Sequence, residues 1–228
     1  MRGCIALDPG GRRPHLRSMT RVKICGLTTS ETLDAALDHG AAFVGAVFFT
    51  RSPRDISPED ARPLFERARG RAEIVAVTVD ADDDLLSRIG AHLRPDFVQL
   101  HGHESVARAH EVRTLTGAGI IKVLSVSTSA DLDAADDWED HADHLMFDAK
   151  PPAGSDLPGG VGATFDWAMM RGRSFRHDWF LAGGLTPDNA AQAAAISGAP
   201  LLDVSSGVES APGVKDRARI AAFLKAVV

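Results

Sequence analysis

Two side chains able to exchange protons end short apolar runs of this 228-residue chain. Cys25 ends the run that begins at Val22, and Asp148 ends the run that begins at Leu145. A thiol and a carboxyl group can act as general base and general acid when a fold brings them to one site. Structural roles stay open for both, because a lone cysteine is often a small buried filler and an aspartate can cap a helix or pair with Lys150.

Two turns rich in glycine and serine follow the last two apolar runs, Leu181-Ala-Gly-Gly-Leu185 and Leu202-Asp-Val-Ser-Ser-Gly207. Such turns can bind phosphate, because glycine leaves backbone N–H groups accessible to an anion. A Gly-Gly pair alone indicates only a tight turn. Two such turns after neighbouring strands favour a phosphate site.

Arginine and histidine residues follow two other runs. Arg51 or Arg54 can supply a guanidinium, with a solvated loop arginine as the alternative. His101 and His103 form an H-x-H pair, but no third ligand has a clear metal-binding spacing. We therefore expect no metal, with one histidine hydrogen-bonded in the site and the other facing solvent.

Eight short runs rich in Val, Ile, Leu and Phe predict strands buried on both faces. They begin near Val22, Phe43, Ile74, Phe97, Ile120, His144, Trp179 and Leu201. Each step between them is long enough for a strand, a helix and two loops, which excludes hairpins. Helices are expected over residues 29–39, 58–69, 82–93, 104–116, 129–140, 165–171, 187–197 and 214–227. This alternation predicts a single α/β domain, a (β/α)8 TIM barrel, with a doubly wound sheet as the alternative.

The C-terminal ends of the strands of a TIM barrel meet at one mouth, so the polar residues above should converge there. Residues 150–162, rich in Pro, Gly and Ser, follow the sixth strand and are expected to form a lid or binding loop. Residues 1–19 can bury little apolar surface and are predicted to be a disordered N-terminal extension. The catalytic barrel is then expected over residues 20–228, with Met19 as a candidate start of translation.

Charge and composition limit the partners. Lys and Arg number 25 against 31 Asp and Glu, a net charge of -6, and no segment concentrates basic residues, so nucleic acid is not expected. No apolar run approaches the ~18 residues of a membrane span. The two cysteines, Cys4 and Cys25, favour the reducing cytoplasm over a disulfide framework. The oligomeric state, monomer or homodimer, stays open.

Six motifs in this order resemble the phosphoribosylanthranilate isomerase family of tryptophan biosynthesis. They are Lys23-Ile-Cys-Gly-Leu-Thr28, Phe49-Thr-Arg-Ser-Pro-Arg54, Val98-Gln-Leu-His-Gly102, Gly159-Gly-Val-Gly-Ala-Thr-Phe-Asp-Trp167, Ala182-Gly-Gly-Leu-Thr-Pro187 and Asp203-Val-Ser-Ser-Gly-Val-Glu209. The resemblance runs from about Arg21 to the C-terminus. It implies a TIM barrel that catalyses, without metal or organic cofactor, an Amadori rearrangement of a phosphorylated aminoaldose.

The resemblance also implies roles for single residues. Cys25 matches the family's general base and Asp148 its general acid, so Asp148 should hold a proton near neutral pH and Cys25 should have thiolate character. Arg54 would meet the anthranilate carboxylate, and His101 and Asp203 match further substrate-binding positions. The phosphate would lie against Gly160, Gly183, Gly184, Ser205, Ser206 and Gly207.

The sequence departs from the family pattern at one position, and two alternative functions stay open. Asp55 follows Arg54 where the family often has an aromatic residue, and its charge could weaken the approach of an acidic substrate or pair with an arginine. Other phosphate-binding barrels, such as ribulose-phosphate epimerases and indole-glycerol-phosphate synthases, use a metal or a lysine with glutamates at the strand ends. A barrel that binds a phosphorylated ligand without catalysis is the alternative from another class.

Overall fold

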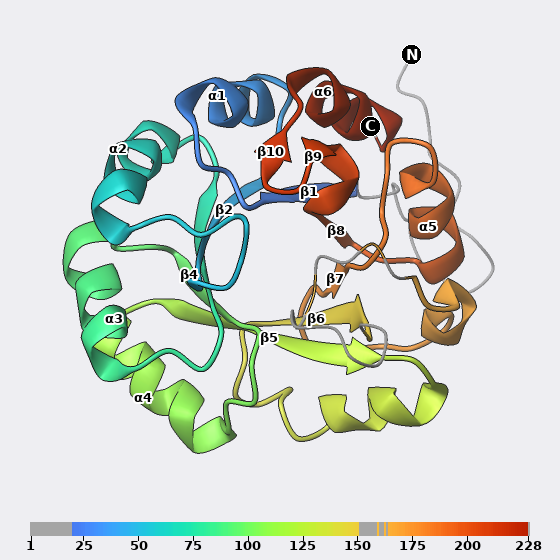
Figure 1. Cartoon of the computed structure of the whole chain (residues 1–228). Coiled ribbons are helices and arrows are strands. Elements are labelled where there is room, and N and C mark those ends of the chain that lie inside the picture. Colours follow the sequence, from blue (N-terminus) through green and yellow to red (C-terminus); the bar gives the residue numbers. More distant parts are fainter. Residues whose placement is uncertain (1–19, 151–158, 160–161, 163, 228) are drawn as a thin grey trace, which may run out of the picture.

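Eight parallel strands close into a barrel in the computed structural model, which describes residues 20–150, 159, 162 and 164–227 (Figure 1). Neighbours along the chain pair with each other, and the first strand also pairs with the last. The strands are β1 (Arg21–Cys25), β2 (Phe43–Phe48), β3 (Glu73–Thr78), β4 (Phe97–Leu100), β5 (Gly119–Val126), β6 (His144–Ala149), β7 (Phe180–Leu181) and β8 (Leu201–Val204). The predicted TIM barrel is confirmed, and the doubly wound sheet is excluded.

An outer layer of helices surrounds the barrel (Figure 1). It contains α1 (Ser30–Asp38), α2 (Pro58–Ala68), α3 (Asp83–Arg88), α4 (Val106–Thr116), α5 (Ala190–Ser197) and α6 (Arg217–Ala226). Helix α2 shows how local sequence sets the start of a helix. The Ser57 hydroxyl accepts the N–H of Asp60, and Pro58 occupies the first turn. Its buried residues include Ala61, Leu64 and Ala68, spaced to form one stripe against the strands.

Three predicted helices differ from the observed elements. The helix expected over 82–93 continues from α3 into a π-helical turn, η1 (Ile89–Leu93). The helices expected over 129–140 and 165–171 are short 3-10 turns, η2 (Ser129–Ala135) and η3 (Trp167–Met170). In η2 the carboxylate of Asp131 accepts the backbone N–H groups of Ser127 and Thr128 and so stabilises the turn locally.

No hairpin joins the eight barrel strands, but a hairpin that the sequence did not predict follows β8. Strands β9 (Glu209–Ala211) and β10 (Val214–Lys215) form an antiparallel pair, and α6 begins at Arg217 rather than at residue 214. Gly213 in the turn has φ +79°, and a Cβ there would lie 2.3 Å from the Pro53 carbonyl oxygen. Glycine is therefore required at this turn, which packs against the loop after β2.

The inside of the barrel is packed with apolar side chains. Phe43, Val75, Ile121, Met146 and Phe180 are each at most 1% exposed. This packing leaves a hollow at the C-terminal ends of the strands. In the part of the chain that the structure describes, no helix has the length and apolar character needed to cross a bilayer.

Candidate active site

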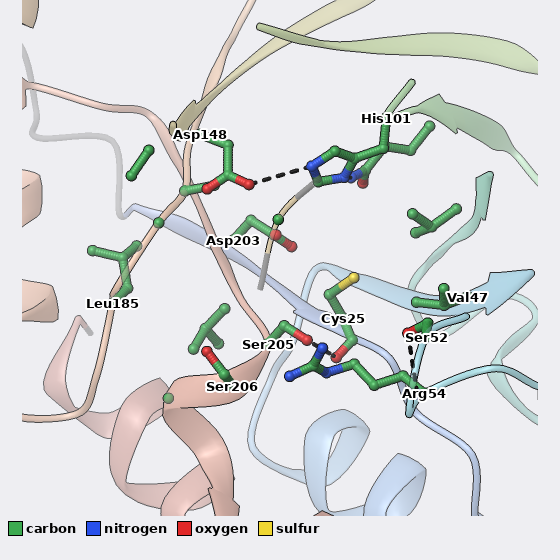
Figure 2. Close-up of a pocket in the computed structure, with 18 of the residues that line it drawn as sticks. Cys25, Val47, Ser52, Arg54, His101, Asp148, Leu185, Asp203, Ser205 and Ser206 are labelled. Atoms are coloured by element: carbon green, nitrogen blue, oxygen red, sulfur yellow. Dashed lines mark hydrogen bonds and ion pairs between the residues drawn. The ribbon is translucent and has the colours of Figure 1, made fainter. Parts of the chain in front are cut away.

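A pocket of about 800 Å³, open to solvent, lies at the C-terminal ends of the barrel strands (Figure 2). Nearly all the residues predicted from the sequence line it: Cys25, Arg54, His101, Asp148, Gly183, Gly184, Asp203, Ser205, Ser206 and Gly207. Gly160 lies outside the described residues, as does most of the segment 150–162 that was expected to be a lid. Convergence of these side chains follows from the parallel strands, whose C-terminal ends meet at the same side of the barrel.

Two residues considered in the sequence do not reach the pocket. Arg51 is exposed, and its guanidinium lies 5.0 Å from the centre of the Phe49 ring. His103 is also exposed, and its backbone N–H donates to Asp80 at 2.7 Å. Among residues 20–150, 159, 162 and 164–227, no three His, Cys, Asp or Glu side chains are grouped so as to hold a metal ion.

His101 and Asp148 form a close pair across the pocket (Figure 2). The Nε2 atom of His101 lies 3.3 Å from Oδ2 of Asp148, and both side chains are largely buried. The two groups are not aligned as a hydrogen bond, so the buried Nε2 atom has no hydrogen-bond partner among the described residues. Gly159 lies over the pair, and a Cβ there would be 2.6 Å from each of these two atoms.

Cys25 ends β1 with its sulfur in the pocket (Figure 2). Burial raises the pKa of the thiol, while the positive charges of Lys23 and Lys215 lower it and the negative charge of Asp203 raises it further. The net effect is a raised pKa, because removal from water destabilises the thiolate more than the two ammonium groups stabilise it. The two lysine charges therefore offset only part of the effect of burial on the thiolate form that the resemblance requires of Cys25.

Arg54 is buried and is not the solvated loop arginine considered as an alternative. Its Nε and Nη2 atoms donate to the two carboxylate oxygens of Glu209 at 2.7 and 2.9 Å. Glu209 also accepts from Lys215 Nζ at 2.6 Å. Gly26 makes room for this arrangement, since a Cβ there would lie 2.7 Å from Cδ of Arg54. The β9–β10 hairpin thus holds the arginine at the pocket wall.

The turns after β7 and β8 meet each other at the wall of the pocket. Gly183 and Gly184 have φ of +88° and +60°, values that favour glycine. A Cβ on Gly207 would lie 1.8 Å from the Leu185 carbonyl oxygen, so only glycine lets the two turns approach this closely. The Ser205 hydroxyl donates to the Cys25 carbonyl, which ties the turn after β8 to β1.

Sequence reasoning missed four charged or polar residues that hold the site together: Lys23, Gln99, Glu209 and Lys215. Lys23 Nζ donates to Asp203 and to Gln99, each at 2.8 Å. Lys23 and Gln99 each stand two positions before a predicted site residue, Cys25 and His101. Side chains alternate along a strand, so this spacing is the signal that could have identified them. No comparable signal links Glu209 to Arg54.

Comparisons with known proteins agree with this geometry. Residues 22–226 match the family model described as N-(5'phosphoribosyl)anthranilate (PRA) isomerase. An N-(5'-phosphoribosyl)anthranilate isomerase of Caulobacter vibrioides is 55% identical over 206 residues, 90% of this chain and 94% of the relative. One from Paramagnetospirillum magneticum is 51% identical over 205 residues, 90% and 95% of the two chains.

Solved structures give the same result. The phosphoribosyl anthranilate isomerase of Thermotoga maritima superimposes with a TM-score of 0.81 and 34% identity, covering 92% of this chain and 98% of that one. A phosphoribosyl anthranilate isomerase in complex with reduced 1-(o-carboxyphenylamino)-1-deoxyribulose 5-phosphate has a TM-score of 0.78 and 32% identity, with the same coverage.

Proposed function

The chain belongs to the N-(5'-phosphoribosyl)anthranilate isomerase family of tryptophan biosynthesis, and on this premise we propose that Cys25 is its general base and Asp148 its general acid. The substrate is N-(5'-phosphoribosyl)anthranilate and the product 1-(2-carboxyphenylamino)-1-deoxyribulose 5-phosphate. The observation that carries the assignment is the meeting of Cys25, the His101–Asp148 pair and the two glycine turns in one pocket.

The first step opens the ribose ring. Asp148 gives a proton to the ring oxygen, the bond from that oxygen to C1 breaks, and the nitrogen lone pair forms a cationic C1=N double bond. This cation withdraws electrons from C2 and makes its proton acidic. Its positive charge also favours the thiolate of Cys25, whose pKa is otherwise raised by burial.

The second step moves the double bond. The Cys25 thiolate takes the C2 proton, the electrons of that C–H bond form C1=C2, and the C=N electron pair returns to nitrogen. The resulting enol takes a proton at C1 and loses its hydroxyl proton to give the C2 ketone. C1 is reduced and C2 oxidised within one molecule, so the balance requires no external oxidant or reductant.

Other pocket residues would bind the ends of the substrate. Arg54 suits the anthranilate carboxylate because a guanidinium binds carboxylates through parallel hydrogen bonds. The turns at Gly183, Gly184 and Ser205 to Gly207, together with Gly160, would hold the phosphate. His101 and Asp203 would bind the sugar between them. A cytoplasmic location is part of the proposal and is favoured by the cysteine usage.

The test measures turnover of phosphoribosylanthranilate by the loss of its fluorescence. Cys25→Ala and Asp148→Asn should each lower kcat by about 10²–10⁴-fold with modest change in KM, because a general acid or base acts in the transition state. Asp84→Asn, at an exposed aspartate of α3, is the matched control and should be as active as the parent. Turnover near the parent value in either site variant would remove that residue from the mechanism.

A growth assay separates the enzyme from a non-catalytic phosphate-binding barrel. Expression of the chain in a tryptophan auxotroph that lacks this isomerase should restore growth without tryptophan. A chain that binds the phosphorylated substrate but restores no growth and gives no turnover would support the binding module instead.

A further inference from the structure

We propose that Lys23 is a positioning residue for both reacting side chains: its ammonium group acts directly on Cys25, and through Gln99 it fixes the His101 proton on the nitrogen that faces Asp148. The inference rests on the proposed function, in which Cys25 is the base and Asp148 the acid. The four residues that it connects lie on β1, on β4 and directly after it, and on β6, so they meet only inside the closed barrel.

Lys23 is completely buried inside the barrel, with 0% of its surface exposed. A buried ammonium group needs polar partners, and Lys23 Nζ donates to Asp203 Oδ1 and to Gln99 Oε1 at 2.8 Å each. Gly45 on β2 leaves room for the lysine, since a Cβ there would lie 3.3 Å from Lys23 Cε. Burial opposes the ammonium form, but Asp203 and Cys25 outweigh it, so the pKa of Lys23 is raised and its charge is retained.

The charge of Lys23 determines which way the Gln99 amide points. An ammonium group has three donors and no acceptor, so the Gln99 atom beside it must be the carbonyl oxygen. The amide NH₂ group then faces His101 Nδ1 at 3.1 Å and can only donate. His101 Nδ1 must accept this hydrogen bond and carries no proton.

The proton of a neutral His101 is therefore on Nε2. That atom lies 3.3 Å from Asp148 Oδ2 and is buried without a hydrogen-bond partner among the described residues. His101 thus offers Asp148 and the pocket a hydrogen-bond donor. It does not offer a lone pair there, which leaves Cys25 rather than His101 to act as the base.

The second effect of Lys23 is on Cys25, two residues along the same face of β1. The positive charge of Lys23 favours the thiolate form of Cys25. The other charges acting on the thiol are Asp203 at the end of β8 and Lys215 on β10, while Arg54 and Asp148 line the same pocket. Burial raises the pKa of the thiol, and Lys23 is the largest influence that lowers it.

The first test titrates the thiol directly. The chain has no tyrosine, so thiolate absorbance near 240 nm can be followed without interference from phenolate. In a full-length Cys4→Ser background, Lys23→Gln keeps a donor for Asp203 but removes the charge, and the thiol midpoint should rise by at least one pH unit. Lys122→Met is the matched control, because Lys122 is also buried and ion-paired, with Glu104, but lies away from Cys25. It should leave the midpoint unchanged. An unchanged midpoint in Lys23→Gln would overturn this part of the proposal.

The second test examines His101 by ¹⁵N NMR, with its signals assigned by comparison with His101→Gln. The parent chain should show the tautomer protonated on Nε2, and protonation of Nδ1 in neutral His101 would overturn the proposal. Gln99→Glu keeps an acceptor for Lys23 but cannot donate to His101, so Nδ1 should become protonated. This variant keeps the buried Lys23–Asp203 pair, adds one carboxylate beside Lys23, and serves if Lys23→Gln does not fold.

Gln99→Glu should also lower kcat at least tenfold with KM changed less than threefold. A neutral His101 protonated on Nδ1 presents the lone pair of Nε2 to Asp148, where it competes with the ring oxygen for the carboxyl proton. An unchanged kcat with altered Nδ1 protonation would overturn the link to Asp148. The thiol and NMR measurements need no substrate, so they report on this inference even if the parent chain shows no turnover and the proposed function fails.

Discussion

Among the buried charged residues Arg54, Glu209 and Lys215, substitution of Glu209 should destabilise the fold most, because its carboxylate binds both cations. It binds Arg54 through two hydrogen bonds, accepts from Lys215 at 2.6 Å and accepts the backbone N–H of Gly213 at 3.1 Å. All three charged side chains are less than 10% exposed. Glu209→Gln would remove the carboxylate that both Arg54 and Lys215 contact, whereas Arg54→Met would leave Glu209 paired with Lys215.

The expected magnitudes differ accordingly. Removing one partner of a buried ion pair and leaving an uncompensated charge costs about 3–5 kcal/mol. Losing hydrogen bonds to a group that stays paired costs about 1.5–3 kcal/mol. At about 2–4 °C per kcal/mol for a domain of this size, Glu209→Gln should lower Tm by about 6–20 °C and Arg54→Met by about half as much.

Urea unfolding at pH 7, followed by tryptophan fluorescence, measures both free energies of unfolding. The double variant Glu209→Gln/Lys215→Met also removes the Lys215 ammonium group, which loses its carboxylate in Glu209→Gln, and should recover part of the loss seen in that single variant. If Arg54→Met is destabilised as much as Glu209→Gln, or if the double variant recovers nothing, the sharing of one anion by two cations is not what stabilises this wall.

The pH dependence gives an independent check with a defined sign. Burial raises the pKa of Glu209, but Arg54 and Lys215 outweigh it and hold the pKa below the ordinary value of 4.5. The folded state therefore binds fewer protons at this group than the unfolded state, and the stability that it contributes is present above about pH 4.5 and lost as the pH falls through the lowered value. The free energy of unfolding of Glu209→Gln should therefore fall less steeply than that of the parent below about pH 4.5. An equally steep fall in both proteins would contradict the reasoning.

Three further predictions concern the pocket walls and the chain start. Gly184→Asp should raise KM, because the new carboxylate would repel the substrate phosphate from the backbone N–H donors of this turn. Inorganic phosphate should compete with substrate for the same donors, and phosphate bound elsewhere in a soaked crystal would contradict this site. In steady-state kinetics the activity of Arg54→Lys should lie between that of Arg54→Ala and that of the parent, since lysine keeps the charge but loses the bidentate geometry. Equal activity of the two variants and the parent would show that Arg54 does not bind the substrate. A chain that begins at Met19 should melt within about 2 °C of full length and turn over substrate normally, because β1 begins at Arg21; a large drop in Tm would refute the boundary.

The sequence by itself determined the barrel and most of the pocket residues. All eight strands begin within one residue of the predicted positions, because parallel strands buried on both faces require continuous apolar runs. The convergence of Cys25, His101 and Asp148 followed from the same reasoning, since each ends or follows a strand and the barrel brings those ends together. The two 3-10 turns and the β9–β10 hairpin were mispredicted, because local hydrogen bonds and a single glycine turn decided them rather than apolar periodicity.

Only the tertiary structure decided how these side chains are paired. Lys23 and Gln99 are 76 residues apart, and Arg54 and Glu209 are 155 apart, so no local pattern relates either pair. Closing the barrel buries these groups together, and burial makes each polar group depend on a specific partner. The same burial raises the pKa of Cys25, which no local sequence pattern indicates. Residue types at strand ends indicate the available chemistry, but protonation states depend on distances and on exclusion of water, which exist only in the folded barrel.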